Sequence, residues 1–184
     1  MDTLAAIRRP IEQDLLQYEE FVRRFFNAET EPLHSILEYV ISNRGKGVRP
    51  MLTMLAASMI TASGDETAEE CGKERHATKR TYLAAMLVEM IHTASLIHDD
   101  VLDSADERRG RASVNAKWQS NMAIILGDYI LARTMSLGLA SAQYDLLSYI
   151  GAAMATLCEG EVLQSQHAKS FDTKREDYYH IIYQ

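Results

Sequence analysis

The prolines of this chain leave most of its length free to form long helices. Only three occur, at positions 10, 32 and 50, and residues 51–184 contain none. Proline is accepted in the first turn of a helix but breaks its interior, so each proline can start a helix and none interrupts a later one. Alternating strand patterns and Asn-Gly hairpin signals are absent from the sequence. The proline placement therefore favours a helical chain.

The spacing of apolar residues supports the same fold class. After Pro10 and again after Pro32, apolar residues recur every three or four positions, as on one face of a helix. Residues 51–62 are almost wholly apolar, which indicates a buried helix. The polar segment 63–78 is expected to be a loop or a short exposed helix. The polar segment 105–113 is expected to be a loop. Further helices are expected at residues 79–104, 120–142 and 144–168. The sequence predicts one all-α domain over residues 1–184, a bundle of long, mostly antiparallel helices.

Charge, cysteines and the N-terminus narrow the class of protein. Acidic residues outnumber basic ones by 26 to 19, giving a net charge of −7, which argues against a general nucleic-acid binder. Cys71 and Cys158 are isolated, as is typical of a reducing compartment. Residues 1–13 lack the apolar segment of a secretory signal, and no window approaches the ~20 apolar residues of a membrane span. We therefore expect a cytoplasmic protein without a transmembrane segment.

Three carboxylates close the apolar segment 79–104, in the order His98-Asp99-Asp100-Val101-Leu102-Asp103. Asp99 and Asp103 share one helix face, while Asp100 lies about 100° round the helix. Like charges at this spacing repel, and acids at a helix C-terminus oppose the helix dipole. A divalent cation would relieve both costs, and carboxylates suit Mg²⁺ held jointly with a substrate phosphate. A solvated acidic helix end is the alternative, and local chemistry leaves both open.

Two basic clusters accompany the carboxylates. Arg108-Arg109-Gly110 follows Asp103 closely, and its guanidiniums could form ion pairs or bind a polyanion. Arg44-Gly45-Lys46-Gly47-Val48-Arg49-Pro50 precedes a buried helix, where glycines allow close backbone approach and the helix N-terminus favours anions. His92 lies two turns before Asp99 on the same helix face. It is either a core histidine or part of the same site.

These residues together resemble a known family. Residues 91–103, IHTASLIHDDVLD, followed by Arg108-Arg109-Gly110, resemble the first aspartate-rich region of the trans-isoprenyl diphosphate synthases, and in particular the long-chain, octaprenyl- or solanesyl-type polyprenyl diphosphate synthases. The turn Gly45-Lys46-x-x-Arg49-Pro50 is similar to an upstream substrate motif of that family. Two further similar segments are Gly127-Asp128-Tyr129 and Glu159-Gly160-Glu161-x-x-Gln164. The resemblance extends from residue 7 to residue 184.

The resemblance implies a fold, a reaction and a role for each residue. The fold would be the isoprenoid synthase bundle around a central cavity, and the enzyme a prenyltransferase that condenses isopentenyl diphosphate with an allylic diphosphate. Mg²⁺, or Mn²⁺ in its place, would be bound on the allylic diphosphate by Asp99, Asp100 and Asp103, with Arg108 contacting that diphosphate. Isopentenyl diphosphate would be held by Lys46, Arg49, His92 and Arg109. Glu161 and Gln164 would lie on a facing helix near the metal, and the protein would be a homodimer.

The resemblance also bears on product length. Ala94 and Ser95, about one turn before Asp99, are small residues. Family members that make short products tend to carry a bulky aromatic residue there, which closes the product tunnel. The resemblance therefore implies an open tunnel and products longer than farnesyl.

The sequence departs from the family pattern in its last part. The family's second aspartate-rich motif is not reproduced by Asp172, Glu176 and Asp177, the last acids before Gln184. The family's paired glycines before the lysine are Arg44-Gly45 here. We therefore expect the N-terminal portion of a larger synthase, which binds diphosphate weakly and turns over slowly or not at all.

Two other functions remain open. Glu89-x-x-His92 and Glu31-Pro32-Leu33-His34 have the Glu-x-x-His spacing of ferritin-like di-metal bundles, although neither explains the arginines or the Asp cluster. The chain could also be a non-catalytic subunit of a two-component prenyl synthase. Such subunits often lose the Asp cluster, which this chain keeps.

Overall fold

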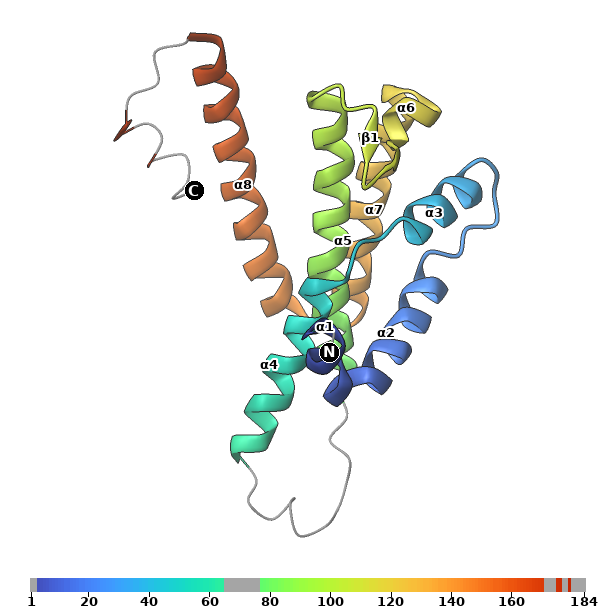
Figure 1. Ribbon diagram of the computed structural model, residues 1–184, viewed down its shortest axis with the longest axis vertical. Coiled ribbons are helices and arrows are strands. Elements are labelled where there is room, and N and C mark those ends of the chain that lie inside the picture. The colour runs from blue at the N-terminus through green and yellow to red at the C-terminus, as the bar shows by residue number, and fades with distance from the viewer. Residues whose placement is uncertain (1–2, 65–76, 171–174, 177–178, 180–184) are drawn as a thin grey trace. The chain divides into compact units, whose positions relative to one another are not determined.

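The computed structural model describes residues 3–64, 77–170, 175–176 and 179, and most of them are helical (Figure 1). The elements in chain order are α1 (Thr3–Arg8), a 3-10 turn (Arg9–Ile11), α2 (Glu12–Phe25), α3 (Leu33–Ser42), α4 (Val48–Gly64), α5 (Lys79–Leu102), β1 (Glu107–Arg108), β2 (Arg111–Ala112), α6 (Val114–Trp118), α7 (Ser120–Ala140) and α8 (Tyr144–Ser170). The predicted all-α class is confirmed. Two compact units are present, Met1–Leu137 and Gly138–Gln184, and the single domain over residues 1–184 stays a prediction.

The predicted helices agree with α5, α7 and α8 to within about two residues at each end. The predicted loop at 105–113 differs, because it contains a short antiparallel hairpin in which Arg108 faces Arg111. Its turn residues Arg109 and Gly110 have φ values of 57° and 73°, a backbone region that glycine adopts at little cost. Most of the predicted segment 63–78 lies outside the described residues, as do Cys71 and most of the chain after residue 170.

The core of the first unit forms around α5. This helix is apolar on most sides, and Met86, Met90 and Ala94 have at most 1% of their surface exposed. Helix α4 packs along α5, and α2, α3 and α7 contribute most of the remaining cluster. The largest fully buried side chains of these neighbours include Val22, Ile36, Leu37, Met54, Leu126 and Ile130. Because α5 is enclosed along most of its length, its C-terminal carboxylates are held on a rigid support.

Among the residues that the structure describes, two helices are long and apolar enough to cross a membrane, which differs from the expectation that no such window exists. They are Ser120–Ala140, with mean hydropathy 1.4, and Tyr144–Gln166, with mean hydropathy 1.3. The expectation that no such window exists was wrong, because it looked for an unbroken apolar run. The mean hydropathy of a helix can be high although small and neutral polar residues interrupt that run. In α7, 33% of the window is buried, and core helices of soluble proteins have the same length and composition.

A close contact between α5 and α7 gives a first prediction. A Cβ atom on Gly127 would lie 2.2 Å from Nε2 of His98, whose ring is within 3.2 Å of the Ile124 carbonyl. We expect Gly127→Ala to lower the free energy of unfolding by about 1–3 kcal/mol, because the ring must move. Gly151 in α8 has no atom within 4 Å of such a Cβ, so Gly151→Ala should raise stability by about 0.5–1 kcal/mol.

Urea unfolding of both variants measures these changes. Adding His98→Ala to Gly127→Ala should recover part of the loss, since the clashing ring is then gone. Equal effects of the two glycine substitutions would contradict the close contact.

Candidate functional site

The acidic end of α5 carries two carboxylates on one face. Asp103 is the C-cap of α5, and its backbone N–H donates to the Asp99 carbonyl at 2.8 Å. Asp99 is half-buried and Asp103 is exposed. Burial raises the pKa of Asp99, and the nearby charges of Asp103 and Asp100 raise it further, while Arg108 lowers it. Such a pair is a favourable place for a cation.

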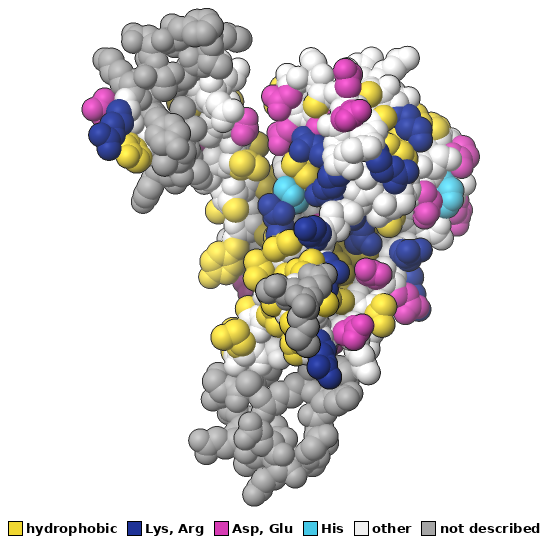
Figure 2. Space-filling view, viewed as in Figure 1, with side chains coloured by type: hydrophobic (Ala, Val, Ile, Leu, Met, Phe, Trp, Pro, Cys, Tyr) yellow, Lys and Arg dark blue, Asp and Glu magenta, His cyan; other side chains and the backbone are white. Residues whose placement is uncertain are grey.

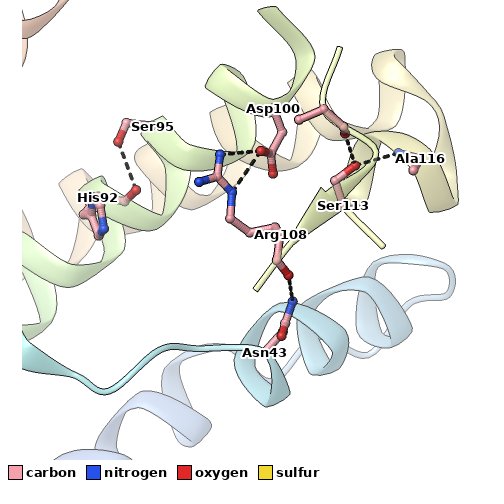
Figure 3. A network of polar contacts seen from close by, with 8 residues as sticks. Asn43, His92, Ser95, Asp100, Arg108, Ser113 and Ala116 are labelled. Atoms are coloured by element: carbon pink, nitrogen blue, oxygen red, sulfur yellow. Dashed lines mark hydrogen bonds and ion pairs between the residues drawn. The ribbon is translucent and has the colours of Figure 1, made fainter. Parts of the chain in front are cut away.

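Asp100 has a different environment from the other two carboxylates. It is 3% exposed, and its Oδ1 accepts from Nε of Arg108 at 2.9 Å and from Nη2 at 2.5 Å (Figure 3). This hydrogen bond is also the main cause of a raised pKa of Arg108. The structure therefore brings Arg108 to the acidic end of α5 through Asp100. The predicted roles of Asp100 in metal binding and of Arg108 in diphosphate binding stay predictions.

The hairpin that carries Arg108 and Arg109 is held to the α3 segment through both of its strands. Tyr39 in α3 donates its hydroxyl to the Ala112 carbonyl at 2.7 Å, and the Asn43 amide donates to the Arg108 carbonyl at 3.4 Å. After the hairpin, Ser113 caps α6 by accepting from the Ala116 N–H at 2.9 Å (Figure 3). The hairpin thus has a defined position beside α3 and α5.

Arg109 brings the two basic clusters together. Its guanidinium lies against Gly45, where a Cβ would be 2.8 Å from Arg109 Cζ, and its Nη1 donates to the Asn43 carbonyl at 3.1 Å. Only a residue without a side chain leaves room for this contact. The glycine-lysine turn and the arginine pair, more than sixty positions apart in sequence, therefore form one basic surface.

His92 lies beside this surface on α5. It is half-buried, and burial lowers its pKa, with further lowering by the charges of Arg49, Arg109 and Arg108. On the face drawn in Figure 2, Lys and Arg side chains gather around a histidine. Next to them, a cleft of about 720 Å³ is lined by Gly45, Lys46 and Glu89 together with residues of α1 and α2. The structure thus places His92 near the charges of Arg49 and Arg109, with Lys46 lining the adjoining cleft, and the predicted binding of isopentenyl diphosphate by these four residues stays a prediction.

The remaining predicted residues lie in two places. Ala94 has no exposed surface and belongs to the core, whereas Ser95 is half-buried and donates its hydroxyl to the His92 carbonyl at 2.9 Å. Glu161 and Gln164 are exposed on α8, in the second unit. Their predicted place near the metal stays a prediction.

The second Glu-x-x-His pair of the ferritin-like alternative, Glu31 and His34, makes hydrogen bonds to residues nearby in sequence. Glu31 accepts from the Ser35 hydroxyl at 2.7 Å, and Nδ1 of His34 lies 3.0 Å from the Ala28 carbonyl. Among the described residues, no group of three or more His, Cys, Asp or Glu side chains is arranged to hold a metal on its own. A carboxylate-rich di-metal centre is therefore not supported in this part of the chain.

The sequence analysis did not assign Glu89 to this site. Glu89 is 5% exposed, lies one turn before His92 and shares with it the nearby charges of Arg49 and Arg109. The sequence did contain a signal for Glu89, because it is an acid in an otherwise apolar stretch of helix. A buried acid requires partners, so such a position indicates a site.

Comparison with known proteins decides the family. A model of the polyprenyl synthetase family matches residues 30–184. The chain belongs to this family. It is 32% identical over 179 residues to an all-trans-nonaprenyl-diphosphate synthase (geranyl-diphosphate specific) of Rhodobacter capsulatus, covering 96% of the chain and 50% of the relative. It is 31% identical over 171 residues to the octaprenyl diphosphate synthase of Escherichia coli, covering 93% and 49%.

Solved structures of the polyprenyl synthetase family share the fold. A polyprenyl synthase from Caulobacter crescentus, crystallised with calcium and isoprenyl diphosphate, matches with a TM-score of 0.81 and 26% identity, covering 98% of this chain and 51% of that one. A decaprenyl diphosphate synthase from Rhodobacter capsulatus matches with a TM-score of 0.79 and 29% identity, covering 97% and 51%. The resemblance seen in the sequence is thereby confirmed, and the chain spans about half the length of the relatives it matches.

Proposed function

We propose that this chain provides both diphosphate sites of a prenyltransferase that adds isopentenyl diphosphate to an allylic diphosphate, giving a long-chain trans product. The observation that carries this proposal is the contact of Arg109 with Gly45, which joins two basic segments beside an acidic helix end. Membership of the polyprenyl synthetase family supplies the reaction class. The two diphosphates would then lie within reach of each other.

Each group of residues has a distinct task in the proposed reaction. Asp99 and Asp103, with Asp100, would hold Mg²⁺ or Mn²⁺ on the allylic diphosphate, and Arg108 would bind the same diphosphate. When bound, the metal stabilises the negative charge that develops on the leaving diphosphate. Lys46, Arg49, His92 and Arg109 would hold isopentenyl diphosphate. Its double bond attacks the allylic cation, a new carbon–carbon bond forms, and loss of a proton restores a double bond.

The donor set fits a divalent cation shared with a substrate. Asp99 and Asp103 supply carboxylate oxygens on one face, where burial and the charge of Asp103 raise the pKa of Asp99. Mg²⁺ commonly uses one or two carboxylates together with substrate phosphates. The Caulobacter relative was crystallised with calcium and isoprenyl diphosphate, which is consistent with such shared binding.

We further propose a cytoplasmic homodimer as the working form of the protein. A two-component enzyme is the second candidate, because a relative from Geobacillus stearothermophilus, 30% identical over 175 residues, is named heptaprenyl diphosphate synthase component 2. Incubation with labelled isopentenyl diphosphate, an allylic primer and Mg²⁺ distinguishes a one-component from a two-component enzyme. Elongated products from this protein alone favour the one-component enzyme, and products only after addition of a different chain favour the two-component enzyme. Failure to bind either diphosphate would contradict both.

The position of Ser95 gives a prediction on product length. Phenylalanine at Ser95 or Ala94 is expected to shorten the products, because a bulky ring one turn before Asp99 would close the tunnel. Ser95→Phe is the cleaner variant, since Ala94 is fully buried and a larger residue there would overpack the core. Chromatography of the labelled products measures chain length. An unchanged product distribution from an active Ser95→Phe variant would count against an open tunnel at this point.

A further inference from the structure

Glu89 is a buried carboxylate that the proposed reaction does not use. It is 5% exposed, although it borders the cleft that Gly45 and Lys46 also line. Among the residues that the structure describes, no donor lies within hydrogen-bond distance of its Oε2. A buried carboxylate oxygen without such a partner is costly, so Glu89 needs an electrostatic reason to be there.

The surroundings of Glu89 are strongly basic. The charges that act on it belong to Arg44 in the turn before α4, Arg49 in α4 and Arg109 in the hairpin. Tyr18 from α2 also faces it and is buried. The other charged residues that line the cleft are Arg8, Glu12, Glu19, Arg23 and Lys46. Arg44 lines the same cleft as Glu89, and the Arg109 guanidinium lies against Gly45, which also lines it, so Glu89 is a buried acid among basic residues.

We propose that Glu89 is the counter-ion of the empty isopentenyl diphosphate site and is replaced in that role by the substrate diphosphate. In the empty site, ionised Glu89 offsets the mutual repulsion of Arg44, Arg49 and Arg109. When the diphosphate arrives, the arginines turn to it, and Glu89 takes up a proton from solvent. Glu89 therefore sets how tightly the site binds anions, and it keeps simple anions from occupying the arginines. This inference rests on the proposed function of Arg49 and Arg109.

The direction of proton transfer follows from electrostatics. Burial raises the pKa of Glu89, and the charges of Arg49, Arg44 and Arg109 lower it in part. A bound diphosphate both occupies these arginines and adds negative charge nearby, so it raises the pKa of Glu89 further. Diphosphate binding then takes up protons. The affinity for diphosphate falls as pH rises from the pKa of Glu89 in the free protein to its pKa in the complex. One coupled proton corresponds to about tenfold in affinity per pH unit in that window.

The test compares the wild-type chain with Glu89→Gln and Glu19→Gln. Glu19 lines the same cleft but is exposed, so Glu19→Gln makes the same change of charge without burial. Calorimetric titration with isopentenyl diphosphate and with inorganic diphosphate, between about pH 5 and pH 9 and in buffers of different ionisation enthalpy, gives affinity and proton uptake together. Comparison with the wild type cancels the ionisation of the free ligand.

We expect Glu89→Gln to take up fewer protons than the wild type and to bind both ligands about tenfold more tightly at the upper end of the pH range. Glu19→Gln should follow the wild type. An unchanged pH dependence, or weaker binding at high pH, in Glu89→Gln would overturn the role of Glu89 while leaving the proposed function intact. If the wild type binds neither ligand, the proposed function fails, and the role of Glu89 fails with it.

Folding is checked separately. A carboxyl whose pKa is higher in the folded than in the unfolded chain makes the folded state less stable as pH rises above about 4.3. Glu89→Gln should therefore unfold no more easily than the wild type at neutral and higher pH. Should it fail to fold, Glu89→Asp keeps a titrating carboxyl and is expected to keep the proton uptake. Loss of proton uptake in a folded Glu89→Asp variant would also overturn the proposal.

Discussion

Asparagine at both Asp99 and Asp103 is expected to remove the Mg²⁺-dependent part of allylic diphosphate binding, a loss of about 100-fold or more in affinity. The two carboxylates share one face at the end of α5, and the pKa of Asp99 is raised by burial and by the charge of Asp103, although Arg108 lowers it in part. The amides keep the shape of the side chains but carry no charge. Titration of the chain with an unreactive allylic diphosphate, with and without Mg²⁺, measures the effect.

Asp106→Asn is the matched control for this prediction. Asp106 lies in the same acidic stretch, is exposed, and accepts the Ser113 N–H through its backbone carbonyl rather than its side chain. Its replacement should leave binding unchanged. If the double asparagine variant still gained affinity from Mg²⁺, the cation would not be held at this end of α5.

The second large effect is expected on stability. Arg108→Ala should lower the free energy of unfolding by about 3 kcal/mol, because it leaves the Asp100 carboxylate buried without its cation. The side chains of Asp100 and Arg108 are 4% and 35% exposed, and Asp100 Oδ1 accepts two hydrogen bonds from the guanidinium. Replacing both residues, as Asp100→Leu with Arg108→Leu, should cost less than Arg108→Ala alone. Urea unfolding of the single and double variants measures the coupling.

An exposed ion pair provides the comparison. Glu20 and Arg24 pair one turn apart on α2, with side chains 63% and 77% exposed. Arg24→Ala should cost at most about 1 kcal/mol. Similar costs for Arg24→Ala and Arg108→Ala would mean that the Asp100–Arg108 pair does not support the hairpin.

Much of the fold could be predicted from the sequence, because its signals are local. Proline placement and apolar spacing gave α5, α7 and α8 to within about two residues. The hairpin at 107–112 was missed, because two-residue strands leave no alternating pattern. The membrane-span length of α7 and α8 was also missed, since it depends on average hydropathy rather than on an unbroken apolar run.

The site was predictable only as a set of residue types. Spacing along one helix placed Asp99, Asp103 and His92 on a common face. The contact of Arg109 with Gly45 depends on how the hairpin packs against α3, which no local pattern encodes. The burial of Asp100 and Glu89 likewise depends on neighbours that are distant in sequence, so their partners became visible only in the structure.

The most direct test of the two proposed diphosphate sites is an experimental structure of the chain with Mg²⁺, isopentenyl diphosphate and an unreactive allylic diphosphate. We predict one diphosphate among Lys46, Arg49, His92 and Arg109, and the other with the metal at Asp99 and Asp103. Both diphosphates bound elsewhere, or a single one bridging the two groups of residues, would contradict it.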